Sequence, residues 1–262
     1  MKYDEDMPSR ANRSSVWGAK SIASSPIRTS HPVPVVSHED GVLTLHFGSD
    51  FIQSQMAVGE PDSLALAYTR TMMSFEVFMP EPREIALVGL GGGSMAKWCH
   101  RHHPQARFTA VEVNPHVIAV REMFGVPPES PRFRILCEDG AKFVANPPNR
   151  FDVLLLDCCT SDRLPRELCS QEFYNHCREA LTAKSLMVVN LCWRKDARII
   201  SRIRKSFGGQ VLLSTDSNGN TVVFACKGEL LWPENEDESS FRLKLKRFER
   251  KYRLGKAMTP RG

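Results

Sequence analysis

The sequence lacks the long uncharged run that a membrane-spanning helix or a signal peptide would need. A spanning helix takes about 20 consecutive apolar residues, and no stretch of this chain approaches that length without a charge. The N-terminus, MKYDEDMPSR, has no apolar core of the kind that directs secretion. We therefore expect a soluble, cytoplasmic protein without a transmembrane segment.

The chain also lacks cysteine pairs of the CxxC type. It has eight cysteines, of which Cys158 and Cys159 are adjacent, but their spacing matches neither a zinc site nor a small disulfide framework. We expect no metal site, and we expect the cysteines to be reduced thiols.

The main body of the chain, residues 1–240, has no excess of positive charge. The net charge is +5, from 35 basic and 30 acidic residues, but residues 241–262 carry nine basic side chains against one acid. Residues 1–240 therefore carry −3, which gives them no electrostatic reason to bind nucleic acid. The apolar residues of the basic tail recur at helical spacing: Phe241, Leu245, Phe248 and Tyr252. This pattern predicts an amphipathic helix packed on the body, with contact to an anionic membrane or nucleic acid as the alternative.

Composition and patterning divide the chain into four segments. Residues 1–33, rich in Ser, Arg and Asn, are expected to be a disordered tail. Residues 34–80 predict a small N-terminal β or lid module that ends in a helix-like stretch from Pro61 to Phe78. Residues 81–230 predict a Rossmann-like, nucleoside-binding catalytic domain, and residues 231–262 are the basic tail that can form a helix.

In the third segment, buried apolar runs alternate with helical segments, which predicts a parallel sheet with right-handed crossovers. The expected parallel strands are residues 85–89, 108–113, 133–137, 151–156 and 186–191. Two further strands, 211–214 and 221–225, are joined by a turn at Asn218-Gly219 that is too short for a crossover helix, so they must pair antiparallel. A mostly parallel α/β sheet with such a terminal hairpin is typical of the class I, S-adenosylmethionine-dependent methyltransferase fold.

Two features predict a nucleoside site at the ends of the first two strands. Gly89, Gly91 and Gly93 belong to a GxGGG turn, whose backbone amides can approach a ligand at the start of a helix. Glu112 ends the second strand, where an acid can accept hydrogen bonds from both ribose hydroxyls. Tight strand-to-helix packing and a solvated acid at a strand end are the alternatives.

The third and fourth strands also end in acids. Asp139, followed by Gly140, is placed to accept from an adenine amino group, or it only caps a helix. Asp157 ends a central strand at the ligand crevice, where it can hold or deprotonate a nucleophile. Its alternative role is to cap a helix or pair with Arg163.

Seven motifs occur in an order and spacing that resemble one enzyme family. They are QSQM at 53–56, YTRTMM at 68–73, the glycine turn at 89–94, VEVNP at 111–115, EDG at 138–140, FDVLLLD at 151–157 and QEFY at 171–174. From about residue 41 to 224 the chain resembles the spermidine synthase (polyamine aminopropyltransferase) family, particularly its shorter bacterial spermidine synthase-like branch.

The resemblance implies a transferase that moves an aminopropyl group from decarboxylated S-adenosylmethionine to a small-molecule amine such as putrescine, releasing methylthioadenosine. It implies that Gln53 lies near the donor sulfur, Glu112 binds the ribose, Asp139 lies on the adenine side and Asp157 is the catalytic aspartate. A homodimer is compatible with it, and no metal is implied.

The sequence departs from the family pattern at three positions. Tyr68 and Asp162 are the candidate substrate-binding residues. Thr160 and Arg70 stand where the family has acids, and Gly92 replaces the family acid that helps to bind the donor's aminopropyl ammonium. Fewer carboxylates would recognise a doubly positive diamine more weakly. Two other functions therefore stay open: a small-molecule methyltransferase that uses S-adenosylmethionine, and a nucleoside-binding protein without turnover.

Overall fold

A computed structural model describes six stretches of the chain: residues 31–48, 51–159, 164–192, 196–216, 218–228 and 238–253. Most of the segment expected to be a disordered tail lies outside these stretches, as does the candidate residue Asp162. Within them, no helix combines the length and apolar character needed to cross a membrane.

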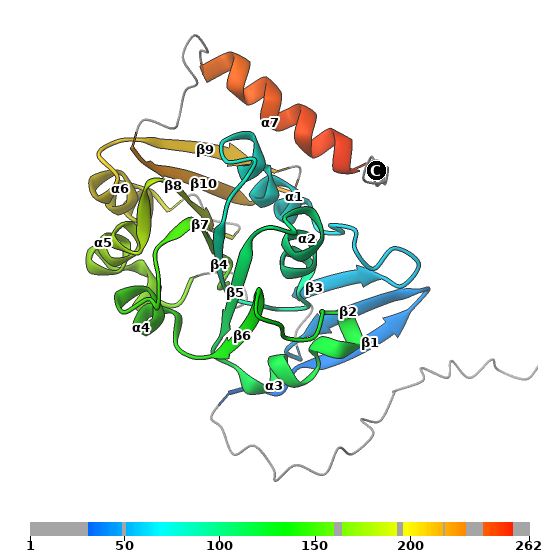
Figure 1. Ribbon diagram of the computed structural model, residues 1–262. Helices are drawn as coiled ribbons and strands as arrows, with labels where there is room; N and C mark the ends of the chain where they lie inside the picture. Colours follow the sequence, from blue (N-terminus) through cyan, green and yellow to red (C-terminus); the bar gives the residue numbers. More distant parts are fainter. Residues whose placement is uncertain are drawn as a thin grey trace, which may run out of the picture.

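The centre of the molecule is a seven-stranded sheet with the strand order β6-β5-β4-β7-β8-β10-β9 (Figure 1). Its strands are β4 (Glu84–Val88), β5 (Arg107–Glu112), β6 (Phe133–Cys137), β7 (Phe151–Leu156), β8 (Leu181–Asn190), β9 (Val211–Thr215) and β10 (Thr221–Lys227). Strands β4 to β8 pair in parallel, whereas β10 runs antiparallel to both β8 and β9. The predicted class I methyltransferase-like sheet, with its terminal antiparallel hairpin, is confirmed.

A second, three-stranded antiparallel sheet precedes the central one. It contains β1 (Val35–Glu39), β2 (Val42–His46) and β3 (Ile52–Ala57). Leu45 and Met56 from this sheet bury their side chains against Phe124, which follows β5 in the chain. This contact anchors the small sheet on the large one.

Helices cover both faces of the central sheet (Figure 1). One face carries α4 (Gly140–Ala145), α5 (Gln171–Glu179) and α6 (Ala197–Ser206); the other carries α1 (Ala67–Met73), α2 (Ser94–His102) and α7 (Glu238–Arg253). The shorter helices are α3 (Pro115–Ala119) and the 3-10 helices η1 (Ser74–Val77), η2 (Arg121–Phe124) and η3 (Arg166–Cys169).

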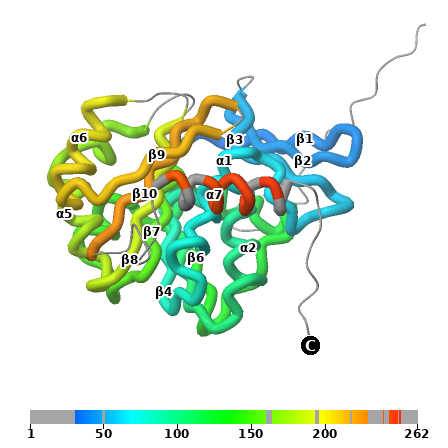
Figure 2. Tube along the Cα trace, turned by 90° about the horizontal axis from the view of Figure 1, so that it is seen from above, coloured from blue at the N-terminus to red at the C-terminus, as the bar shows by residue number. Residues whose placement is uncertain are grey.

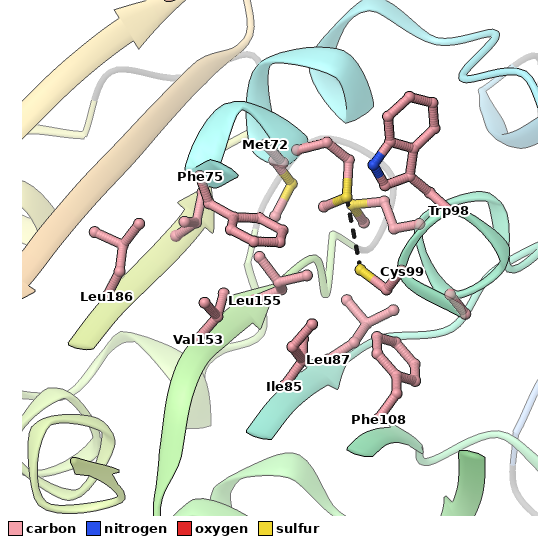
Figure 3. Packing of buried hydrophobic residues seen from close by; sticks show 14 of the residues in the cluster. Met72, Phe75, Ile85, Leu87, Trp98, Cys99, Phe108, Val153, Leu155 and Leu186 are labelled. Atoms are coloured by element: carbon pink, nitrogen blue, oxygen red, sulfur yellow. Dashed lines mark hydrogen bonds between the residues drawn. The ribbon is translucent and has the colours of Figure 1, made fainter. Parts of the chain in front are cut away.

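Alternation along the strands explains why two cores form. In β4, Ile85 and Leu87 belong to the core that also contains Met72 of α1, Phe75 of η1 and Cys99 of α2 (Figure 3). The intervening Ala86 belongs to the opposite core. Successive side chains of a strand point to opposite faces, so a continuous apolar run fills both layers.

The basic tail forms the helix that its apolar spacing predicted. Helix α7 lies along α1 and η1 (Figure 2), and its Leu245 is only 2% exposed within the core. Phe248, one turn later, packs partly against the same core. The apolar side of α7 thus covers the body, while Lys246, Arg247 and Arg250 are exposed.

The helix-like stretch expected from Pro61 begins later than predicted. Turns occupy the first residues, and α1 starts only at Ala67 before continuing as η1. The Arg70 side chain donates to the carbonyl oxygens of Leu64 and Ala65. These side-chain bonds give two carbonyl oxygens before α1 a partner outside any helix.

Candidate active site

A cavity of about 830 Å³ opens at the carboxyl ends of β4, β5 and β7, with residues of β3 in its wall. Its volume suits a small-molecule ligand, and its position is where open α/β sheets bind ligands. Eight of the ten site residues expected from the sequence line it: Gln53, Tyr68, Gly89, Gly91, Glu112, Asp139, Gly140 and Asp157.

Glycine makes room for neighbouring atoms at two positions of the turn. At Gly89, with φ of 95°, a Cβ would overlap the backbone oxygen of Asp157, so glycine lets the ends of β4 and β7 approach closely. Gly93 is not among the lining residues; it precedes α2, and a Cβ there would overlap Val126. At Gly93, glycine is therefore needed for close packing at the start of α2 and not for lining the cavity.

Ser54 is a site residue that the sequence reasoning did not single out. Its Oγ accepts a hydrogen bond of 2.7 Å from the Gly92 amide. A Cβ at Gly92 would lie 2.9 Å from the Ser54 Cβ and 3.0 Å from the Phe124 ring. The acid of the family pattern therefore has no space at position 92, because β3 and η2 pack there.

Glu112 links the second strand to the glycine turn. Its Oε2 accepts from the Leu90 amide and its Oε1 from the Asn114 amide, both at 2.9 Å. Both oxygens are therefore engaged by backbone amides. Each carboxylate oxygen keeps a second lone pair, so this fixed group can still accept from ribose hydroxyls.

Asp139 caps a helix at the cavity wall. Its Oδ1 accepts from the amides of Ala141 and Lys142, at 2.9 and 3.0 Å, and so caps α4. The same residue lines the cavity. The helix-cap alternative is confirmed, and it fixes the carboxylate at the cavity wall.

Asp157 lies at the other end of the cavity, held by two side chains. The Tyr68 hydroxyl donates to Oδ2 and the Asn190 amide nitrogen donates to Oδ1, each at 3.0 Å. Burial raises the pKa of Asp157 above its ordinary value, while these two hydrogen bonds oppose the rise and the charge of Glu112 adds to it. The alternative partner, Arg163, lies outside the described residues.

The Tyr68 hydroxyl keeps its proton beside Asp157 and so stays a hydrogen-bond donor. Burial, followed by the neighbouring charge of Asp157, raises the pKa of Tyr68 well above its ordinary value. The charge of Asp216, before the β9–β10 turn, contributes in the same direction. A neutral hydroxyl therefore faces the Asp157 carboxylate.

The expectation that all cysteines are reduced is wrong for one pair. Cys159 and Cys192 form a disulfide, with their Cα atoms 6.3 Å apart, and both line the cavity. They are 33 residues apart in the chain, but they follow the carboxyl ends of the adjacent parallel strands β7 and β8. The other six cysteines are free thiols.

The turn between β9 and β10 closes part of the cavity wall with Asn218 and Asn220. Asp216, 8% exposed, accepts from the backbone amides of both asparagines and, at 3.1 Å, from the Asn220 side chain. The sequence showed this turn as a hairpin signal only. Among the described residues, no cluster of His, Cys, Asp and Glu side chains could hold a metal ion.

The fold is that of the class I, S-adenosylmethionine-dependent methyltransferase-like proteins, and an acid-lined cavity opens at the carboxyl ends of its strands. Residues 65–210, more than half of the chain, match the family model of the spermine/spermidine synthase domain. The chain belongs to this family.

Individual relatives agree with that assignment. A polyamine aminopropyltransferase of Neisseria meningitidis is 37% identical over 206 residues, which cover 76% of this chain and 78% of the relative. The structure of a probable spermidine synthase from Corynebacterium glutamicum has a TM-score of 0.68 at 19% identity, covering 87% of this chain and 93% of its own. Human methyltransferase-like protein 13, solved with SAH, has a TM-score of 0.57 at 22% identity, covering 75% and 91%. The two structures support the fold alone.

Proposed function

We propose that this protein is a spermidine synthase-like aminopropyltransferase. In this proposal it moves an aminopropyl group from decarboxylated S-adenosylmethionine to an amine such as putrescine and releases methylthioadenosine. Family membership and the polyamine aminopropyltransferase of Neisseria meningitidis support the reaction type. The cytoplasmic location is part of the same proposal.

The observation that carries the proposal is the position of Asp157. This buried carboxylate ends a central strand, lines the cavity and is held by the Tyr68 hydroxyl and the Asn190 amide. A carboxylate so placed can orient an ammonium group and take up its proton.

In the transfer step, the main task of the protein is to align the amine nitrogen with the propyl carbon of the donor. The amine nitrogen forms a bond to the propyl carbon attached to the sulfonium, and the carbon–sulfur bond breaks with its electron pair left on sulfur. Neutral methylthioadenosine leaves, and the Asp157 carboxylate takes the proton given up by the amine. Holding the two reactants together supplies a large part of the acceleration.

The adenosine moiety is assigned to the other end of the cavity. In this proposal Glu112 accepts from the ribose hydroxyls, Asp139 and Gly140 lie on the adenine side, and Gly89 and Gly91 give the backbone room to approach. Gln53 lies nearest the sulfur. The small N-terminal sheet over a Rossmann-like body supports this arrangement.

One observation favours a second candidate, a small-molecule methyltransferase using S-adenosylmethionine. The space at Gly92 is filled by Ser54 and Phe124, so no acid is present there to bind an aminopropyl ammonium or to repel a donor carboxylate. The fold similarity to methyltransferase-like protein 13 is compatible with this candidate.

Product analysis separates the candidates. Purified protein is incubated with each donor and a panel of diamines and polyamines, and the products are identified by mass spectrometry. Aminopropyl transfer predicts methylthioadenosine together with an aminopropylated amine. S-adenosylhomocysteine as the only nucleoside product would support the methyltransferase, and nucleoside binding without either product would contradict both enzymatic candidates.

A further inference from the structure

Asn190 ends β8 beside the candidate catalytic acid. The register of the parallel pair β7–β8 sets Leu156 opposite Val189, which brings the next residues, Asp157 and Asn190, together. Asn190 is 3% exposed, and its Nδ2 donates to Asp157 Oδ1 at 3.0 Å. None of the motifs that carry the family resemblance includes this residue.

The orientation of the Asn190 amide is fixed by the backbone. The Cys192 amide donates to Asn190 Oδ1 at 2.9 Å, and because a backbone N–H can only donate, the amide nitrogen must face Asp157. Cys192 is in turn bonded to Cys159, two residues after Asp157. A closed ring therefore runs from Asp157 through the disulfide and Asn190 back to Asp157.

From this ring we propose that Asn190 is a positioning residue, which holds the Asp157 carboxylate in its reactive orientation and its ionised form by hydrogen-bond donation. The inference rests on the proposed function and assigns this residue a part in it. The other ionisable groups facing Asp157 are Tyr68, Glu112 and Cys158, with Asp216 acting on Tyr68. Of the two donors to the carboxylate, only Asn190 belongs to this ring, which a disulfide and a hydrogen bond close.

Asn190→Asp separates this role from a merely structural one. An aspartate can still accept from the Cys192 amide, so the turn keeps its anchor, but it replaces the donor facing Asp157 with a second acid. Two adjoining carboxylates raise the pKa of one of them. Because a base must be ionised, the acidic limb of the kcat/KM profile should move to higher pH.

The expected shift is at least about one pH unit, which lowers kcat/KM about tenfold on the acidic limb. Activity should recover toward the wild-type plateau at alkaline pH, and methylthioadenosine affinity should stay unchanged. Asn149→Asp is the matched control. The Asn149 Nδ2 donates to Glu84 Oε2 at 2.9 Å, and Glu84 begins β4, at the end of the strand opposite to the cavity. This control should leave the profile as in the wild type.

Carboxyl 13C NMR gives a readout that does not depend on turnover, with Asp157→Asn used to assign the signal. The pKa of Asp157 should rise in Asn190→Asp and, by less, in Asn190→Ala, which also covers the case that one variant does not fold. An unchanged pKa and an unchanged pH profile in a folded variant would overturn the inference while leaving aminopropyl transfer intact. Absence of transfer in the wild type, with the pKa shift present, would instead count against the proposed function alone.

Discussion

The two ends of the cavity are built from different kinds of interaction. At the end to which the proposal assigns the nucleoside (the nucleoside end), Glu112 and Asp139 accept hydrogen bonds from backbone amides close to them in the chain or in the adjacent turn. At the end to which it assigns the transfer step (the transfer end), Asp157 is held by Tyr68 and Asn190, which are 89 and 33 residues away in the sequence. The first end is a property of strand termini, whereas the second depends on how three separate elements meet.

This difference predicts different consequences of mutation. Changes at the nucleoside end should weaken ligand binding and leave the chemistry of the bound complex nearly unchanged. Changes at the transfer end should slow turnover or shift its pH dependence and leave nucleoside affinity unchanged.

Asp157→Asn should have the largest effect, because it removes the proposed base while conserving size. General base catalysis contributes about 10² to 10⁴ in rate, so kcat should fall at least about 100-fold. Steady-state kinetics measures this, with Asp152→Asn as the control, since Asp152 lies at the other end of β7 and accepts from the Arg83 and Glu84 amides. Equal turnover in Asp157→Asn and the wild type would remove the catalytic assignment.

Glu112→Gln should weaken methylthioadenosine binding about 10- to 100-fold, since a charge-assisted hydrogen bond contributes about 1.5 to 3 kcal/mol. Calorimetry gives the dissociation constant. Glu129→Gln is matched to it, because Glu129 also accepts from a backbone amide, that of Ile135, outside the cavity. Similar affinities for the two variants would contradict the ribose assignment.

Tyr68→Phe should lower kcat/KM about tenfold near the acidic limb. Losing this donor raises the pKa of Asp157, so the base is ionised only at higher pH, and one pKa unit corresponds to a factor of ten. The control is Tyr174→Phe, whose buried hydroxyl has no hydrogen-bond partner in the described part of the chain. An acidic limb that moves equally in both variants, or in neither, would count against the role of Tyr68.

Breaking the Cys159–Cys192 disulfide, by Cys159→Ser or by a dithiol reductant, should lower turnover severalfold and leave nucleoside affinity unchanged. It should also lower the free energy of unfolding by about 2 to 4 kcal/mol, because the cross-link restricts the unfolded chain. Chemical denaturation and kinetics with Cys137→Ser, an exposed free thiol, provide the comparison. Unchanged turnover in the reduced protein would show that the ring is not needed at the transfer end.

The smallest effect on the site is expected from Leu245→Ala in α7. This buried side chain packs in the core and does not line the cavity, so its truncation should cost about 2 to 5 kcal/mol of stability without changing methylthioadenosine affinity. Thermal unfolding and calorimetry measure the two quantities. A loss of affinity in the folded variant would make α7 part of the site.

The contrast between the two ends of the cavity also explains which features could be predicted from the sequence. The sheet and the nucleoside end were predictable because Gly89, Glu112 and Asp139 each follow a recognisable strand, and strand ends share one edge of a parallel sheet. The pattern also placed Asp157 correctly on the cavity wall. Their functional roles stay predictions.

The features that the sequence did not predict all depend on contacts between distant segments. The disulfide and the Asn190 contact require the register of β7 against β8, which no local pattern encodes. Ser54 reaches Gly92 only because the small sheet packs on the large one.

A double-mutant cycle between Glu112→Gln and Tyr68→Phe, read as kcat/KM, tests the division between the two ends most directly. Independent sites give additive free energies, to within about 0.5 kcal/mol. The account therefore predicts that the loss in the double variant equals the product of the two single losses, to within about a factor of two. A coupling of more than about 1.4 kcal/mol, a tenfold departure, would contradict it and show that both ends act as one unit.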